Sequence, residues 1–119
     1  RIGQRGEDLA VETVERAGIT VLERNWRGGR VGELDLIGVD ELGEIVIVEV
    51  KTRTSEAFGG SLEAVDHRKL ARMRRLAALW LRSAGRRFLG ADVRFDVIGV
   101  QLDEHSGETT IDWIKAVVP

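Results

Sequence analysis

The sequence contains no cysteine, so disulfide bonds and thiolate metal sites are excluded. No apolar run approaches the roughly 20 residues of a membrane-spanning helix, and no signal-peptide pattern is visible. We therefore expect a cytoplasmic protein with no membrane partner, in keeping with a reducing compartment. The two histidines, His67 and His105, lack zinc-ligand spacing, so we do not expect a zinc site.

Acidic residues are missing from one long stretch of the chain. The 119 residues carry a net charge of −2, yet no acid lies between Asp66 and Asp92. Eight of the 18 basic side chains fall in that stretch, namely Arg68, Lys69, Arg72, Arg74, Arg75, Arg82, Arg86 and Arg87. A polyanion would meet this local basic patch rather than the average charge.

Apolar periodicity and turn residues predict a single domain over residues 1–119 with a mixed α/β fold. The expected order is helix, three strands, helix, two strands, with about five strands in a central sheet flanked by helices. The predicted helices cover Gly3 to Ala17, ended by Gly18, and Asp66 (as N-cap) to Ala84, ended by Gly85. The predicted strands cover Thr20 to Trp26, Val31 to Val39, Glu44 to Thr52, Asp92 to Gln101 and Thr109 to Val118. A loop is expected over Arg53 to Ala64.

Charged side chains interrupt two of the apolar runs predicted as strands. Glu33 and Asp35 lie two residues apart on one strand, and Glu49 and Lys51 lie two residues apart on the next. Residues at this spacing share one face of a strand. Charges within buried strands cost several kcal/mol each unless they are paired or bound to a metal. The pattern therefore points to a functional cluster, and the alternative is a structural ion pair at the end of the sheet.

The link between these two strands predicts their register. Gly43 stands where a three-residue hairpin loop, Glu41 to Gly43, needs a left-handed residue. Directly opposed residues of the two strands then share a face of the sheet, and their Cβ atoms lie about 5 Å apart. This register pairs Asp40 with Glu44, Asp35 with Glu49, and Glu33 with Lys51. Two acids and a Glu-x-Lys brought together in this way suit a hard divalent cation next to a phosphate, which is a nuclease-like arrangement.

Several short motifs carry a family resemblance over almost the whole chain. They are Gly6-Glu7, Asn25-Trp26-Arg27, Gly32-Glu33-Leu34-Asp35-Leu36-Ile37, Val48-Glu49-Val50-Lys51-Thr52-Arg53, Val65 with Lys69, and Arg94-Phe95-Asp96-Val97. Together they resemble the YraN-type family of small bacterial proteins. That family is described as uncharacterised but similar to the restriction-endonuclease-like PD-(D/E)xK fold, near the archaeal Holliday-junction resolvases.

The resemblance implies a Mg²⁺ or Mn²⁺ site. Asp35 matches the acid of the second strand, Glu49 and Lys51 match the Glu-x-Lys, and Glu7 matches the helix-one acid of the resolvase branch. Leu34 stands where the motif has proline. Asp35 and Glu49 would be the main metal ligands, with the Val50 carbonyl and Glu7 as further candidates. Lys51 would orient or deprotonate the attacking water, and Glu33 would support Lys51 or an arginine.

A metal-dependent DNA endonuclease, acting on branched DNA, is the leading hypothesis for the function. A nucleic-acid-binding accessory protein that does not cleave, and a protein-interaction module, are the alternatives. DNA contacts are expected from Arg27, Arg30, Arg53, Arg68, Lys69, Arg72 and Arg75. A homodimer is the assembly that a junction-cutting enzyme would need. Asp96, set between apolar neighbours, is expected to be a buried partner of Arg94 rather than a ligand.

Overall fold

The computed structural model describes residues 2–54 and 67–117, and these form the predicted mixed α/β fold. In chain order the elements are α1 (Ile2–Arg16), β1 (Thr20–Arg27), β2 (Glu33–Val39), β3 (Ile45–Thr54), α2 (His67–Leu81), the short 3₁₀ helix η1 (Arg86–Phe88), β4 (Val93–Leu102) and β5 (Thr109–Ile114). The predicted order is therefore confirmed. No helix in the described ranges is long and apolar enough to cross a membrane.

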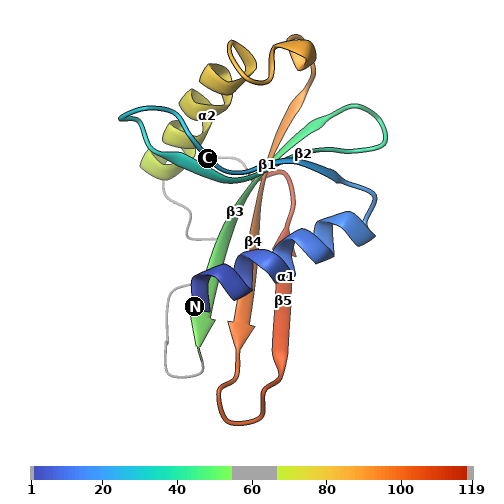
Figure 1. Cartoon of the computed structure of the whole chain (residues 1–119), viewed down its shortest axis with the longest axis vertical. Helices are drawn as coiled ribbons and strands as arrows, with labels where there is room; N and C mark the ends of the chain where they lie inside the picture. Colours follow the sequence, from blue (N-terminus) through green and yellow to red (C-terminus); the bar gives the residue numbers. More distant parts are fainter. Residues whose placement is uncertain (1, 55–66, 118–119) are drawn as a thin grey trace.

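The five strands form one sheet in the order β1-β2-β3-β4-β5. Neighbouring strands run antiparallel except for β3 and β4, which are parallel. Parallel neighbours need a crossover connection, and α2 lies within the connection between β3 and β4. Figure 1 shows α1 crossing β4 and β5, while α2 lies at the other end of the sheet near the β1–β2 hairpin.

Apolar residues alternate along the central strand and fill two cores, one on each face of the sheet. Val46 and Val48 of β3 pack with Ala10 and Val14 of α1. On the opposite face, Ile45 and Ile47 belong to the cluster that contains Met73, Leu76 and Trp80 of α2. This two-sided burial explains why β3 reads as a continuous run of Val and Ile.

Several element ends differ from the prediction. The second helix ends at Leu81 rather than Ala84, because the chain turns back and the Trp80 carbonyl accepts hydrogen bonds from the amides of Ser83 and Gly85. A Cβ atom at Gly85 would lie 2.4 Å from the Trp80 ring, so this close turn needs glycine.

The strand ends shift by a few residues, as pairing with the neighbouring strand decides them. The second strand begins at Glu33, β3 continues to Thr54, β4 covers Val93–Leu102, and β5 ends at Ile114. Arg53 and Thr54 therefore belong to β3 rather than to a loop. The rest of the predicted loop up to Ala64, and the predicted N-cap Asp66, lie outside the described residues.

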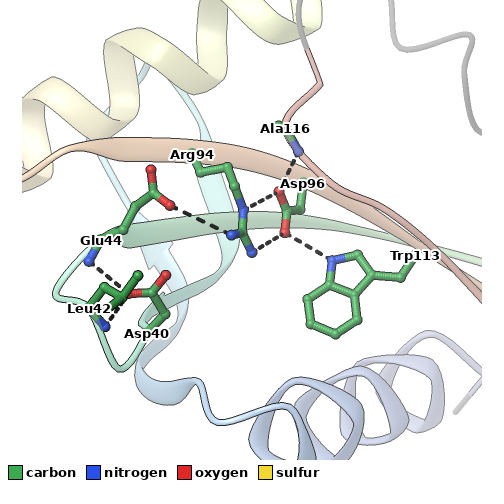
Figure 2. A network of polar contacts seen from close by, with 7 residues as sticks. All are labelled: Asp40, Leu42, Glu44, Arg94, Asp96, Trp113 and Ala116. Carbon is green, nitrogen blue, oxygen red and sulfur yellow. Dashed lines mark hydrogen bonds and ion pairs between the residues drawn. The ribbon is translucent and has the colours of Figure 1, made fainter.

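Asp96 on β4 is fully buried and carries a charge, and its partners surround it (Figure 2). The Arg94 guanidinium donates two hydrogen bonds to its carboxylate, each 3.0 Å long. The Trp113 indole N–H and the Ala116 amide donate two more, each 2.9 Å. Arg94 Nη1 also lies 3.6 Å from Oε1 of Glu44, the residue before β3. The predicted Arg94–Asp96 partnership is confirmed, and it ties the ends of three strands together.

Replacing Arg94 should therefore destabilise the whole domain. In Arg94→Met the buried Asp96 carboxylate loses its compensating charge, and we expect the free energy of unfolding to fall by about 3–5 kcal/mol. Urea denaturation measures this. The control is Arg16→Met, which removes a solvent-exposed pair with Glu12 and should cost less than about 1 kcal/mol. Similar losses in both variants would contradict a structural role for the buried network.

Candidate functional site

The predicted register between β2 and β3 is confirmed, and the ladder ends at the candidate site. Leu36 pairs with Val48 and Val39 with Ile45, and the turn has Gly43 at φ +87° as expected. Continued by one residue, this register sets Asp35 opposite Glu49. No backbone pairing between the two strands extends to that position. The strands part there, and Asp35 lies at the fork.

Next to the fork, β2 also changes the face of the sheet toward which its side chains alternate. Leu34 packs in the α2 core and Leu36 in the α1 core, although residues two apart share a face in a regular strand. On β1, their partners Trp26 and Arg24 flank Asn25, whose φ is +51°. Asparagine adopts this left-handed conformation more readily than most residues. The irregular backbone turns Asp35 toward β3, where its Oδ2 accepts a 2.8 Å hydrogen bond from the Val50 amide.

The surroundings of Asp35 make its negative charge unfavourable. Burial, followed by the charge of Glu49 and more weakly that of Glu7, raises the pKa of Asp35 from 3.8 to about 7. The Val50 amide and the ammonium of Lys69 act in the opposite direction, toward a lower pKa. Asp35, Glu49, Glu7 and Lys69 thus interact as one electrostatic cluster, which we call the acid cluster. The positive charge of Lys69 compensates only part of the negative charge of the three acids.

Glu49 reaches the acid cluster from β3 and meets Lys69 from α2. The Lys69 Nζ atom lies 2.5 Å from Glu49 Oε2, and the two side chains are 32% and 14% exposed. The packing of α2 explains this contact, because Ile47 and Met73 share one core cluster. Glu49 follows Ile47 by two residues, and Lys69 precedes Met73 by about one helical turn. Lys69 was predicted as a DNA contact, and this ion pair with Glu49 was not foreseen.

Glu7 is brought to the acid cluster by the close approach of α1 to β3. A Cβ atom at Gly6 would overlap the Thr52 side chain, so the helix backbone lies directly against the strand. Glu7 Oε1 accepts a 3.0 Å hydrogen bond from the Asn25 side chain and lies 3.7 Å from Arg24. Sequence reasoning did not foresee these two partners. The Asn25-Trp26-Arg27 motif was the available signal, but it gave no role to asparagine.

The remaining predicted site residues, Lys51 and Glu33, lie on β3 and β2. Lys51 lies on β3 two residues after Glu49, half-buried, in register with Gly99 of β4. Glu33 is exposed and lies 3.8 Å from Arg27, so its partner is an arginine, one of the two options expected. The register with Lys51 is not continued at Glu33, because the ladder has already ended.

A basic surface borders the acid cluster. Arg68, Arg72 and Arg75 are exposed on α2, and Arg27 and Arg30 are exposed at the end of β1 and the loop after it. The loop lies against the helix, since a Cβ atom at Gly32 would lie 3.5 Å from Arg72 Cδ and one at Gly28 would meet Leu76. The predicted DNA contacts of the loop and of the helix are therefore neighbours. Arg53 lies near the end of β3.

The donor chemistry of the acid cluster fits a hard divalent cation. Within residues 2–54 and 67–117, no group of three acidic or histidine side chains is placed to hold a metal ion. Mg²⁺, however, is commonly held by one or two carboxylates, with water and phosphate oxygens as the other ligands. Asp35 and Glu49 offer two such carboxylates, and their repulsion is what a cation would relieve. Metal binding at this place stays a prediction.

Comparisons with known proteins give one family and a group of relatives. The family described as "Uncharacterised protein family UPF0102" matches residues 6–100. A UPF0102 protein of Mycobacterium sp. strain KMS is 56% identical over 102 residues, covering 85% of this chain and 73% of that protein. A UPF0102 protein of Mycobacterium tuberculosis strain H37Ra is 48% identical over 111 residues, covering 92% and 84%.

Two solved structures resemble the chain at low sequence identity. A repair endonuclease from Pyrococcus abyssi gives a TM-score of 0.44 at 17% identity, covering 84% of this chain and 37% of that one. The EndoMS–dsDNA2 complex gives 0.43 at 20% identity, covering 80% and 32%. The chain thus spans roughly a third of the length of each structure.

Neutralising Asp35 should stabilise the metal-free protein, and only at higher pH. The folded protein binds this proton up to about pH 7 and the unfolded chain only to about pH 3.8, so the contribution of Asp35 to the free energy of unfolding falls as pH rises between these values. Asp35→Asn removes the charge and keeps an oxygen for the Val50 amide. We expect a gain on the order of 1–2 kcal/mol at pH 8 and almost none at pH 4.

Thermal denaturation at both pH values, without divalent cations, measures this gain. Asp112→Asn, at an exposed position on β5, is the matched control and should change stability little at either pH. An equal gain for Asp35→Asn at pH 4 and pH 8 would show that its charge is not the cause.

Proposed function

The chain belongs to the uncharacterised protein family UPF0102, and from the acid cluster we propose that it is a Mg²⁺- or Mn²⁺-dependent endonuclease that hydrolyses DNA phosphodiester bonds. This is the YraN-type family to which the sequence motifs pointed. The observation that carries the proposal is the placement of Asp35 at the fork between β2 and β3, hydrogen-bonded to Val50 and beside Glu49. A fold has no structural need for two acids that repel each other in a half-buried place.

Each residue of the site has a proposed role that its position supports. Asp35 and Glu49 hold the divalent cation, with the Val50 carbonyl and Glu7 as further ligands. A bound cation supplies positive charge to the phosphoryl and leaving oxygens. Lys51, on the strand of Glu49, orients or deprotonates the attacking water. Asn25 and Arg24 fix the position of Glu7.

The basic surface of α2 and the neighbouring loop is proposed to bind the DNA backbone. Arg72 lies over Gly32, and Lys69 of the acid cluster lies one turn earlier on the same helix. A DNA backbone whose phosphates bind the exposed arginines would therefore run toward the acid cluster. A preference for branched DNA and a homodimeric assembly remain predictions from the family resemblance.

A non-catalytic accessory protein is the second candidate, and one observation favours it. The Lys69 ammonium is bound to Glu49, so one of the two proposed metal ligands already has a cation. A protein that only binds DNA could keep this pair permanently. The two candidates differ in whether the acid cluster is needed for cleavage.

Substitutions in the acid cluster should separate cleavage from DNA binding. We expect Asp35→Asn and Glu49→Gln to lower Mg²⁺- or Mn²⁺-dependent cleavage by about a hundredfold or more, with DNA binding intact or tighter because a charge facing phosphate is lost. Lys51→Ala should keep the metal and lose about 10²–10⁴-fold in turnover. The measurement is cleavage of branched, flapped, nicked and single-stranded DNA in either metal.

Glu12→Gln is the matched control for these variants, since it removes an exposed acid of α1. Cleavage that survives all three site substitutions would point to contamination or to another site. A wild type that binds DNA but cuts none of the substrates would support the accessory protein.

Charge reversal on α2 should weaken DNA binding at every sequence. In the triple variant of Arg68, Arg72 and Arg75 to Glu, lost phosphate contacts should reduce the slope of log K against log salt by about 0.9 each. Affinities across a salt series measure this. The control reverses Arg5 and Arg16 on α1, which packs on the other face of the sheet. Unchanged affinity in the triple variant would move the DNA site elsewhere, toward Arg27, Arg30 and Arg53.

A further inference from the structure

Lys69 is the member of the acid cluster with a positive charge, and its backbone is firmly placed. Leu70 and Met73, which follow it on α2, are both buried, and Met73 packs in the core cluster of Ile47. The ammonium extends from this fixed helix to Glu49 Oε2 at 2.5 Å. Glu49 is 14% exposed and Lys69 is 32% exposed, so the ion pair is partly withdrawn from solvent. It differs in this from the exposed Arg16–Glu12 pair on α1.

The three acids of the cluster are held by partners of different kinds. Asp35 accepts from a backbone amide of β3, which cannot leave without breaking the strand. Glu7 accepts from the short side chain of Asn25. Glu49 is paired with the end of a flexible four-carbon side chain. Glu7 also lies 3.7 Å from Arg24, so the cluster has two cationic side chains beside it. Of these, Lys69 contacts the proposed metal ligand Glu49, and it can be exchanged there without any change of fold.

We propose that Lys69 holds the place of the divalent cation at Glu49 in the metal-free protein and competes with that cation for the carboxylate. Its ammonium compensates Glu49 against Asp35 and Glu7 and keeps the carboxylate oriented toward the fork. When a divalent cation takes Glu49, Lys69 withdraws and is free to face a phosphate of the bound strand. This inference rests on the proposed function, because it concerns the same acid cluster.

If Lys69 competes with the metal, removing it should change metal affinity in the opposite direction from removing a residue that only supports the site. Loss of a residue that merely shapes a metal site weakens metal binding. Loss of a competing cation strengthens it, while the metal-free protein becomes less stable because Glu49 is left uncompensated. Lys69→Met keeps much of the apolar side chain and removes the charge, so it tests this difference directly.

The experiment measures Mn²⁺ affinity by isothermal titration calorimetry and melting temperature with and without Mn²⁺. We expect Lys69→Met to bind Mn²⁺ on the order of tenfold more tightly than the wild type. Its metal-free melting temperature should be lower, and Mn²⁺ should raise it by more than it raises that of the wild type. Lys69→Arg, which keeps the charge, should not bind Mn²⁺ more tightly than the wild type.

Arg72→Met is the matched control, since it removes a positive charge one turn further along α2, beside Gly32. We expect its Mn²⁺ affinity to stay within about twofold of the wild type, because screening weakens a charge that does not contact the carboxylate. If Lys69→Met does not fold, Lys69→Gln carries the same expectation, as it also lacks the charge.

The outcomes separate this inference from the proposed function. Wild-type Mn²⁺ binding that is unchanged or weakened in Lys69→Met or Lys69→Gln overturns the competition and leaves the metal site standing. An equal gain in Arg72→Met also overturns it, because general electrostatics would then be the cause. No Mn²⁺ binding by the wild type or by any variant overturns the metal dependence of the proposed function, and the competition falls with it.

Discussion

The hydrogen bond from the Val50 amide to the Asp35 carboxylate is the interaction on which the site depends. In a continuous antiparallel ladder, a backbone carbonyl of the neighbouring strand would accept from such an amide. Here a side chain takes that place, so β2 and β3 can separate without leaving a polar group of the central strand unsatisfied. The same hydrogen bond holds an acid in a half-buried position that it would otherwise avoid. The same hydrogen bond therefore allows both the fork between the strands and the acid cluster to form.

The hairpin and its charges could be predicted from the sequence because their determinants are local. A three-residue turn ending at Gly43 fixes the register, and a period of two then decides which side chains face each other. The partnership of Arg94 with Asp96 was predictable for the same reason, since two residues on one strand share a face. The family was also recognisable, because its motifs lie in short blocks along the chain.

The contacts of Lys69 and Asn25 could not be predicted, because they depend on how separate elements pack. Lys69 meets Glu49 only after α2 has settled on β3 through Ile47 and Met73. Asn25 reaches Glu7 only where β1 departs from regular strand geometry, and no alternation rule signals a positive φ in advance. From the sequence, Arg68, Lys69, Arg72 and Arg75 of α2 have the same expected role as DNA contacts. In the structure, Lys69 contacts Glu49 of the acid cluster, and the three arginines are exposed.

The parallel pairing of β3 with β4 has a consequence for how the chain folds. Each pair in this ladder joins residues 48 positions apart, from Ile45 with Val93 to Thr54 with Leu102. Contacts this distant in sequence form slowly, because a long loop must close before they become favourable. The central strand also leaves the ribosome before both of its later partners, Lys69 and β4. For that interval the edge of β3 lacks β4 and its Glu49 lacks Lys69, and an unpaired apolar strand edge of this kind favours aggregation of the nascent chain.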